Sequence, residues 1–240
     1  MTWTRWLKIN ETTTQMSHKD DGDKPKITIA FHLVAIIVIS LLCVIIYSNT
    51  LNAPFAFDDA TNIENNSYIQ LKRIDIQQLI DSGFKSPIKN RPLANISFAL
   101  NYYFGGYDVA GYHIVNIIIH FINGILVYFL SHAIFIHTFD AKNQNFPLFN
   151  NIPIPLISVF AALIFIAHPV QTQSVTYIVQ RMNAMASLFC LLSLRLYISG
   201  RLSQTQWKRW VFFSGCFASW LMALGSKEIA GAFPFVMMLY

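Results

Sequence analysis

Residues 27–47 read ITIAFHLVAIIVISLLCVIIY, an almost unbroken apolar stretch. A helix needs about 20 such residues to cross the hydrocarbon core of a bilayer, so this stretch predicts a first membrane span. Residues 1–26 before it are polar and carry both signs of charge, which predicts a disordered tail. Because no small-residue cleavage site follows the apolar run, we interpret it as a signal anchor rather than a signal peptide.

Five further apolar stretches predict an all-α polytopic membrane protein. They are residues 112–137, 152–167, 182–199, 211–224 and 229–240. Composition agrees, because only 12% of the residues are charged, whereas a soluble domain carries about 25%. The three cysteines, Cys43, Cys190 and Cys216, fall inside apolar stretches and form no CxxC pair, which argues against a thiolate metal site. We therefore expect residues 27–240 to form one membrane domain.

The positions of the lysines and arginines predict how the chain is oriented. Alternating spans put residues 48–111 outside as the longest loop if the N-terminus is cytoplasmic. Five of the 17 cations lie in that loop, and loops this long obey the positive-inside rule poorly. Ten of the other twelve then lie on the cytoplasmic side. We expect a multi-pass protein of a bacterial inner membrane or the endoplasmic reticulum, with residues 1–26 as a cytoplasmic tail.

The outer loop contains two runs with apolar residues at helical spacing. The first covers residues 74–80, and the second is opened by Pro92 and ended by Gly105 and Gly106. The apolar residues of the second run, up to Phe104, are typical of a helix that lies in the membrane interface. The sequence thus predicts amphipathic helices in the first outer loop.

Four polar clusters lie on the outer face in this topology. They are Asp58-Asp59, Asn90-Arg91, the stretch from His168 to Gln180-Arg181, and Lys227-Glu228. Ionisable groups at membrane depth are expensive and often mark a function, although any one of them could be a helix end that reaches water. Their convergence on one face predicts a shared polar site.

The residue types in these clusters suit phosphate chemistry. Asp58 or Asp59 could act as a general base toward a hydroxyl, or hold a divalent cation, so a metal stays possible. The cations Arg91, Arg181 and Lys227 could bind a phosphate. Together they would suit glycosyl transfer, because a carboxylate removes the acceptor proton while the cations stabilise the departing lipid phosphate.

The histidines and Glu228 have simpler alternatives. His168 could donate to an anion, ligate a metal or only cap its helix, and Glu228 could simply pair with Lys227. His113 and His120 share one helix face, but no carboxylate accompanies them. We therefore expect them to make hydrogen bonds between helices rather than to bind a metal.

The order of the motifs resembles a known family. The motifs are NAPFAFDD (52–59), NRPL (90–93), GYHIVN (111–116), HPVQTQSV (168–175), QR (180–181) and SKE (226–228). This set, over residues 35–240, resembles the membrane half of the transmembrane and tetratricopeptide-repeat-containing O-mannosyltransferases and their bacterial relatives. Those proteins belong to the C-type glycosyltransferase superfamily, so the resemblance implies a helical bundle of that type.

The resemblance implies an enzyme that moves mannose from a polyprenyl-phosphate carrier to a protein hydroxyl. Its partners would be a lipid-linked sugar donor, a protein or peptide acceptor and membrane lipids, with no nucleic acid. The acidic motif of the family maps onto Asp58 and Asp59 as catalytic residues. The donor-binding candidates are Arg91, His168, Gln180, Arg181, Lys227 and Glu228.

This sequence departs from the family pattern in two ways. The family core has more than six spans, and tetratricopeptide repeats normally follow it, whereas these 240 residues contain no 34-residue helical repeat. We therefore expect the chain to correspond to an N-terminal membrane portion. Two other functions stay open at this point. One is a non-catalytic membrane anchor of a repeat protein, and the other is a transporter, which would have ionisable residues near mid-membrane.

Overall fold

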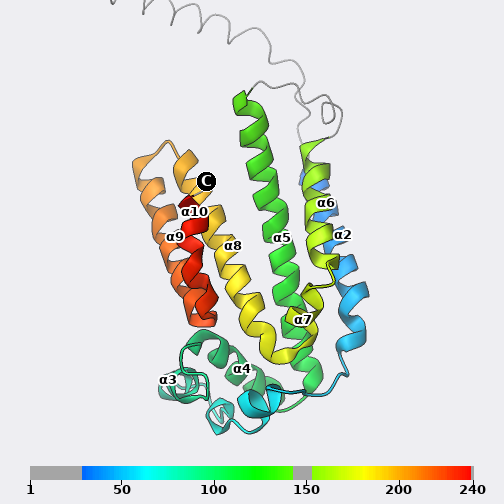
Figure 1. The fold of residues 1–240 in the computed structure, drawn as a ribbon, viewed down its shortest axis with the longest axis vertical. Coiled ribbons are helices and arrows are strands. Elements are labelled where there is room, and N and C mark those ends of the chain that lie inside the picture. Colours follow the sequence, from blue (N-terminus) through cyan, green and yellow to red (C-terminus); the bar gives the residue numbers. More distant parts are fainter. Residues whose placement is uncertain (1–28, 143–152, 239–240) are drawn as a thin grey trace, which may run out of the picture. The chain divides into compact units, whose positions relative to one another are not determined.

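The computed structural model describes residues 29–142 and 153–238, and these consist of helices and turns without a strand (Figure 1). The predicted all-α class is therefore confirmed. Residues 35–240 form one compact unit, and the arrangement given below is that of this unit. The tail predicted at 1–26 lies outside the described residues, as does most of the loop predicted after the second span.

Every predicted apolar stretch contains a helix. These helices are α2 (Ile29–Tyr47), α5 (Val109–Lys142), α6 (Ile154–Ala167), α8 (Arg181–Leu202), α9 (Gln206–Ser226) and α10 (Phe233–Met238). Three segments of the described chain are long and apolar enough to cross a membrane, namely Ile29–Thr50, Val109–His137 and Ile178–Leu202. The chain is thus a membrane protein, while six spans remain a prediction.

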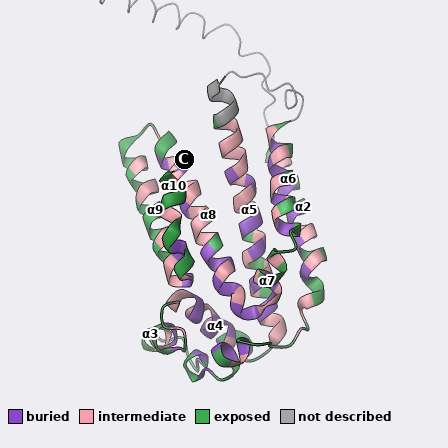
Figure 2. Ribbon diagram, viewed as in Figure 1, coloured by how far each residue is buried: buried purple, intermediate pink, exposed green. Residues whose placement is uncertain are grey.

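The long helices pack as neighbours with apolar outer faces. Helix α8 lies along α9, and α5 contacts both α6 and α8. Helices α2, α5 and α6 approach closely at Gly124, where an added Cβ would lie 2.7 Å from Ile166 and 3.2 Å from Ile39. The hydroxyl of Tyr47 donates to the Ile166 carbonyl at 3.0 Å, which joins α2 to α6. Figure 2 shows exposed and half-buried residues along the outer faces, as lipid contact requires.

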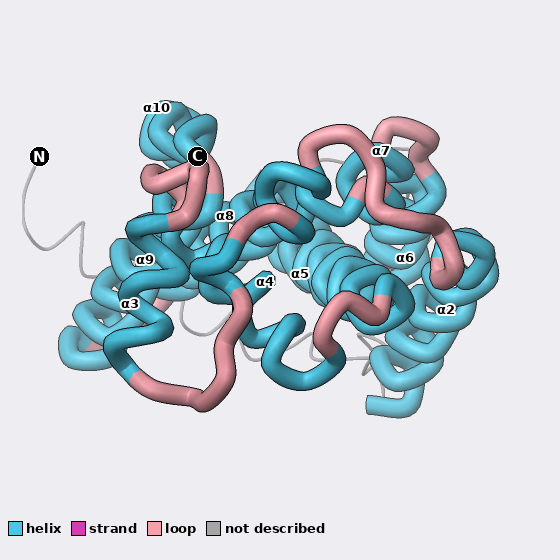
Figure 3. The backbone as a smooth tube through the Cα atoms, turned by 90° about the horizontal axis from the view of Figure 1, so that it is seen from below, coloured by secondary structure: helices cyan, strands magenta, loops and turns pink. Residues whose placement is uncertain are grey.

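Short elements gather at one end of the long helices (Figure 3). From the first outer loop come η1 (Ser48–Thr50), the π-turn η2 (Ala60–Glu64), η3 (Ser67–Ile69), α3 (Ile76–Lys85) and α4 (Pro92–Gly105). Later parts of the chain add α7 (Gln171–Thr176), η4 (Ile178–Gln180) and η5 (Glu228–Ala232). This end of the molecule therefore combines residues that are far apart in the sequence.

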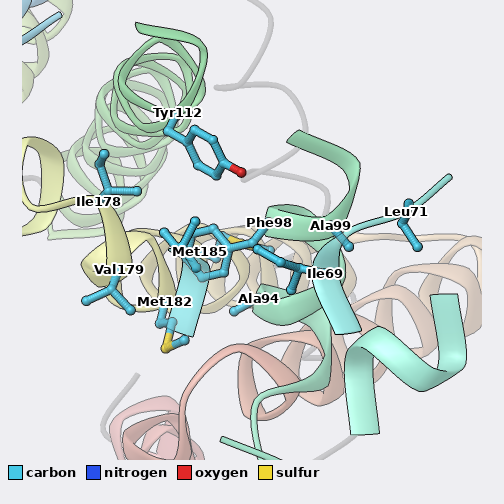
Figure 4. Packing of buried hydrophobic residues seen from close by; sticks show 11 residues of the cluster. Ile69, Leu71, Ala94, Phe98, Ala99, Tyr112, Ile178, Val179, Met182 and Met185 are labelled. Atoms are coloured by element: carbon cyan, nitrogen blue, oxygen red, sulfur yellow. The ribbon is translucent and has the colours of Figure 1, made fainter. Parts of the chain in front are cut away.

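Helix α4 begins at Pro92 and ends at Gly105 as predicted, and Gly106 follows with a left-handed φ of +58°. Its central turns pack against protein, because Ala94, Phe98 and Ala99 are fully buried, and its place in the membrane interface stays a prediction. They join an apolar cluster with residues of η3, α5 and α8 (Figure 4). Helix α3 is the amphipathic one, with exposed Ile76, Ile80 and Phe84 and a face that packs on α4.

A buried arginine connects three of these helices. Arg181, the first residue of α8, is 0% exposed. Its Nε donates to Asn116 Oδ1 on α5 at 2.7 Å, and its Nη2 donates to Asn101 Oδ1 on α4 at 2.8 Å and to the Tyr112 carbonyl at 3.0 Å. The guanidinium also lies over the Phe98 ring, 4.7 Å from its centre. These contacts satisfy a charge that would otherwise be very costly to bury.

We predict that Arg181→Met destabilises the fold. The variant leaves the side-chain oxygens of Asn101 and Asn116 buried without donors, and each such group costs about 1–3 kcal/mol. Thermal unfolding in detergent should show a large fall in Tm, and Arg181→Lys an intermediate one. The matched control is Arg201→Met, because Arg201 is exposed. Equal Tm values for Arg181→Met and Arg201→Met would contradict the structural role.

Candidate active site

The polar clusters predicted on one face meet at one end of the long helices. Residues 177–183, which lead from α7 into α8 and are called the 177–183 segment below, contact three of them. Asp59 bonds to Val179 in this segment, and Lys227 bonds to Gln180. Arg91 reaches the Sδ atom of Met182 at 3.3 Å. The segment therefore joins the acidic motif to the basic residues.

Asp59 is the buried member of the acidic pair, at 1% exposure. Its Oδ1 accepts from the Val179 N–H at 2.7 Å, and its Oδ2 accepts from the Ala56 N–H at 3.0 Å. Burial raises the pKa of Asp59 above its usual value, and the two amide donors partly offset this. Because both oxygens face backbone amides, Asp59 fixes the acidic loop against the start of α8.

Asp58 is exposed, and its backbone is held on both sides. Its N–H donates to the Tyr177 hydroxyl at 2.9 Å. Its carbonyl accepts from the backbone N–H of Asn62 at 3.0 Å and from Asn62 Nδ2 at 2.8 Å. The loop is thus fixed while the Asp58 carboxylate remains open to a substrate. The structure thus gives different environments to two adjacent carboxylates that the sequence could not distinguish.

Tyr177 is a site residue that sequence reasoning missed. Burial raises the pKa of its hydroxyl, and the negative charges of Asp58 and Asp59 raise it further. The hydroxyl therefore stays protonated near neutral pH, where it can donate a hydrogen bond beside the acidic motif. The one available signal was its place three residues before the Gln180-Arg181 motif, which is too weak to select it.

The basic side of the site is built around Glu228. Nε of Arg91 donates to Glu228 Oε2 at 3.0 Å, and Nδ2 of Asn90 also donates to this carboxylate. The salt bridge is partly exposed, so it contributes little to stability, but it orients the guanidinium. Asn90 is another residue whose role sequence reasoning did not assign, although it stands in the NRPL motif.

Lys227 lies beside this pair. Its Nζ donates to Gln180 Oε1 at 3.5 Å, and Gln180 Oε1 also accepts from Asn183. Burial lowers the pKa of Lys227, and the positive charge of Arg91 lowers it further. The cluster contains two cations, Arg91 and Lys227, and one carboxylate, Glu228, so it has an excess of positive charge. Such a cluster can accept an anion.

Two predicted donor-binding residues have partners other than Arg91, Lys227 and Glu228. Arg181 is fully buried, with its guanidinium bonded to oxygens of α4 and α5. His168 is exposed, and its Nδ1 accepts from the Val170 N–H at 3.2 Å, which is a local contact at the start of α7. We therefore assign Arg181 a positioning role and leave His168 out of the proposed phosphate-binding set.

His113 and His120 both bond to backbone carbonyls, and the bond of His120 runs between two helices as predicted. Nε2 of His120 donates to the Ile166 carbonyl of α6 at 3.3 Å, and Nε2 of His113 donates to the Ala53 carbonyl at 3.0 Å. Within residues 29–142 and 153–238, no three His, Cys, Asp or Glu side chains come together as metal ligands would. A metal site at the acidic motif would need ligands beyond Asp58 and Asp59.

Comparison with known proteins gives consistent relatives. The chain is 33% identical over 164 residues to protein O-mannosyl-transferase TMTC4 of Mus musculus, which covers 65% of this chain and 21% of that protein. It is 31% identical over 175 residues to human protein O-mannosyl-transferase TMTC2, and the match covers 69% of this chain and 19% of that protein. Protein O-mannosyl-transferase tmtc2 of Xenopus laevis is 30% identical to the chain over 179 residues, and the match covers 69% of this chain and 19% of that protein. The chain belongs to the TMTC family.

The matches cover a limited part of the length of these relatives. The chain spans about a fifth of the length of the curated TMTC proteins it matches. No protein-family model matches the sequence, and no solved structure matches the fold. The resemblance inferred from the motifs is thus confirmed at the level of the TMTC family. The contacts and distances of the site described above are those of this TMTC chain itself.

We predict that the two carboxylates differ in their effect on stability. Asp59→Asn places an amide N–H₂ against a backbone N–H, so it should cost about 1–3 kcal/mol of unfolding free energy. Asp58→Asn changes an exposed side chain and should stay within about 0.5 kcal/mol of wild type. Thermal unfolding in detergent measures both. Equal destabilisation by the two variants would contradict the separate roles.

We also predict a pH dependence that depends on Asp59. Because its pKa is raised in the folded state, the unfolded chain loses this proton at lower pH than the folded protein does. Stability from this group therefore falls as pH rises from the ordinary Asp value to the raised one. The Tm difference between wild type and Asp59→Asn should narrow over that interval. A Tm difference that does not change with pH would argue against the raised pKa.

Proposed function

We propose that this chain carries the catalytic end of a membrane glycosyltransferase that moves mannose from a lipid-linked phosphate to a hydroxyl of a polypeptide. The relatives are named protein O-mannosyl-transferases, which supports the sugar and the acceptor class. The observation that carries the proposal is that the 177–183 segment contacts both the exposed Asp58 and the two cations Arg91 and Lys227. Tyr177 and Gln180 are three residues apart, so their Cα atoms are at most about 10 Å apart.

Asp58 is the general base in this proposal. Its backbone is fixed by Tyr177 and Asn62, and its carboxylate is exposed. A base held in this way can take the proton of an acceptor hydroxyl without further ordering of the loop. Asp59 is a positioning residue, because its oxygens accept the amides of Ala56 and Val179.

Arg91 and Lys227 bind the donor phosphate in this proposal. Glu228 and Asn90 hold the guanidinium of Arg91 in place, and Gln180 holds the ammonium of Lys227. As the bond from sugar to phosphate breaks, negative charge grows on the phosphate oxygen. Fixed cations at that point stabilise the transition state more than they stabilise the bound donor.

The proposed reaction is a direct displacement. The acceptor oxygen forms a bond to the anomeric carbon while its proton passes to Asp58. The bond from the anomeric carbon to the phosphate oxygen breaks, and the lipid phosphate leaves with the electron pair. The sugar passes through an oxocarbenium-like state. Attack from the face opposite the phosphate would invert the configuration of the anomeric carbon.

The orientation in the membrane is also part of the proposal. We place the site on the outer or luminal face and the N-terminus in the cytoplasm. The turn between α8 and α9, at the other end of these helices, supports this. Arg201 near the end of α8 flanks it, as do Lys208 and Arg209 in the first turn of α9, beside exposed Trp207 and Trp210. Tryptophans are typical of either membrane interface, and cations in a short connection are typical of the cytoplasmic one.

Transfer by the purified protein tests the proposal. The donor is polyprenyl-phosphate mannose, and the acceptors are serine- and threonine-containing peptides. We expect Asp58→Asn to lower kcat by about 10²–10⁴-fold, as the loss of a general base does. Lys227→Met should lower kcat/KM for the donor by about a hundredfold, because it removes a cation from the phosphate.

Two controls complete this test. Lys227→Arg keeps the charge and should retain most of the activity that Lys227→Met loses. Lys72→Met removes an exposed cation of the same outer loop and should behave as wild type. Undiminished transfer by both Asp58→Asn and Lys227→Met would refute the proposed mechanism. A wild-type protein without transfer would favour the non-catalytic membrane anchor.

A further inference from the structure

Phe57 is an apolar side chain in an unexpected place. It is 88% exposed, the highest value among the large hydrophobic residues of the described chain. It is also the one non-glycine residue described with a positive φ, at +49°. A bulky residue in this conformation is strained, by about 1–3 kcal/mol, and such strain persists only where neighbouring contacts impose it.

The contacts that impose this conformation are the ones that position Asp58. The Phe57 carbonyl accepts from the Ala60 N–H at 3.3 Å, and the next amide, that of Asp58, donates to the Tyr177 hydroxyl. The Phe57 ring lies edge-to-face with the Tyr177 ring, with centres 6.1 Å apart and planes at 80°. The chain thus holds an aromatic ring open to the surroundings beside an open carboxylate.

The position of the ring relative to the two halves of the site suggests its use. Tyr177, which contacts Phe57, begins the segment, and Gln180, which contacts Lys227, lies further along it. Phe57 is therefore next to the proposed base, because it precedes Asp58 in the chain and its ring packs on the tyrosine that holds the Asp58 amide. An acceptor whose hydroxyl lies at Asp58 can place a neighbouring side chain against this exposed ring.

We propose that Phe57 is an anchor for the polypeptide acceptor, where it packs against an apolar side chain next to the serine or threonine that receives the sugar. The inference rests on the proposed function. Exposed aromatic side chains at the centre of a contact often dominate peptide and protein binding. Tyr177 supports the ring from behind and so limits the entropy lost on binding.

A lipid contact for Phe57 is less consistent with its neighbours. Phe57 directly precedes the exposed Asp58 in the chain, and its ring packs on the ring of Tyr177. Insertion of the ring into acyl chains would carry the Asp58 carboxylate toward the hydrocarbon, which is expensive. A polypeptide in water meets no such penalty.

Peptide binding without a donor tests this inference. Two fluorescent peptides share one central threonine, which is flanked by leucines in one and by glycines in the other. Anisotropy titration with the purified protein in nanodiscs gives both Kd values. We expect the leucine peptide to bind about tenfold more tightly, and Phe57→Ala to abolish that preference. Phe57→Trp should keep it.

The controls separate this inference from the proposed function. Phe104→Ala removes another ring that is 78% exposed, in α4, and should leave the preference unchanged. Asp58→Asn should keep the preference while it abolishes transfer. A wild-type protein that shows the preference but no transfer would refute the proposed function and leave the anchor in place.

Three results would overturn the anchor. The first is a leucine preference that survives in Phe57→Ala, and the second is the absence of any preference in wild type. The third concerns lipid contact and uses lipids brominated below the headgroup. If Phe57→Trp shows more fluorescence quenching by these lipids than wild type does, the ring belongs to the bilayer rather than to a peptide.

Discussion

The buried guanidinium of Arg181 is the interaction on which the polar end of this protein depends. It has no carboxylate partner among its hydrogen bonds and is held by the side-chain oxygens of Asn101 and Asn116 and the carbonyl of Tyr112. A charge in this position is tolerable only if its donors are satisfied together. The requirement fixes α4, α5 and the first turn of α8 relative to one another.

The same constraint determines where the neighbours of Arg181 lie. Because the start of α8 is fixed, the backbone N–H of Val179 meets Asp59, and Gln180 and Met182 reach Lys227 and Arg91. Residues from three separate parts of the chain thus take their positions from one short segment. In the proposed enzyme this segment would set the spacing between the base and the phosphate.

The two adjacent aspartates illustrate how a fold separates similar side chains. In a loop held at both ends, one carboxylate turns toward the backbone and the next toward solvent. Asp59 loses water and gains two amide donors, whereas Asp58 keeps its exposure while Tyr177 holds its amide. The strained backbone conformation of Phe57 follows from the same hydrogen bonds that hold this loop. Stability and proposed chemistry are thereby assigned to different residues of one motif.

Hydrophobic periodicity and length determined the helices, because lipid-facing spans need long apolar runs whatever their neighbours are. The order of the motifs was sufficient to place the chain in the TMTC family. Only the tertiary structure decided that α4 is enclosed and that Arg181 is buried among oxygens of α4 and α5. Only the tertiary structure also showed that Tyr177 bonds to Asp58 and that Asn90 bonds to Glu228. Burial and hydrogen-bond partners arise from contacts between distant segments, and a linear pattern of residue types does not contain them.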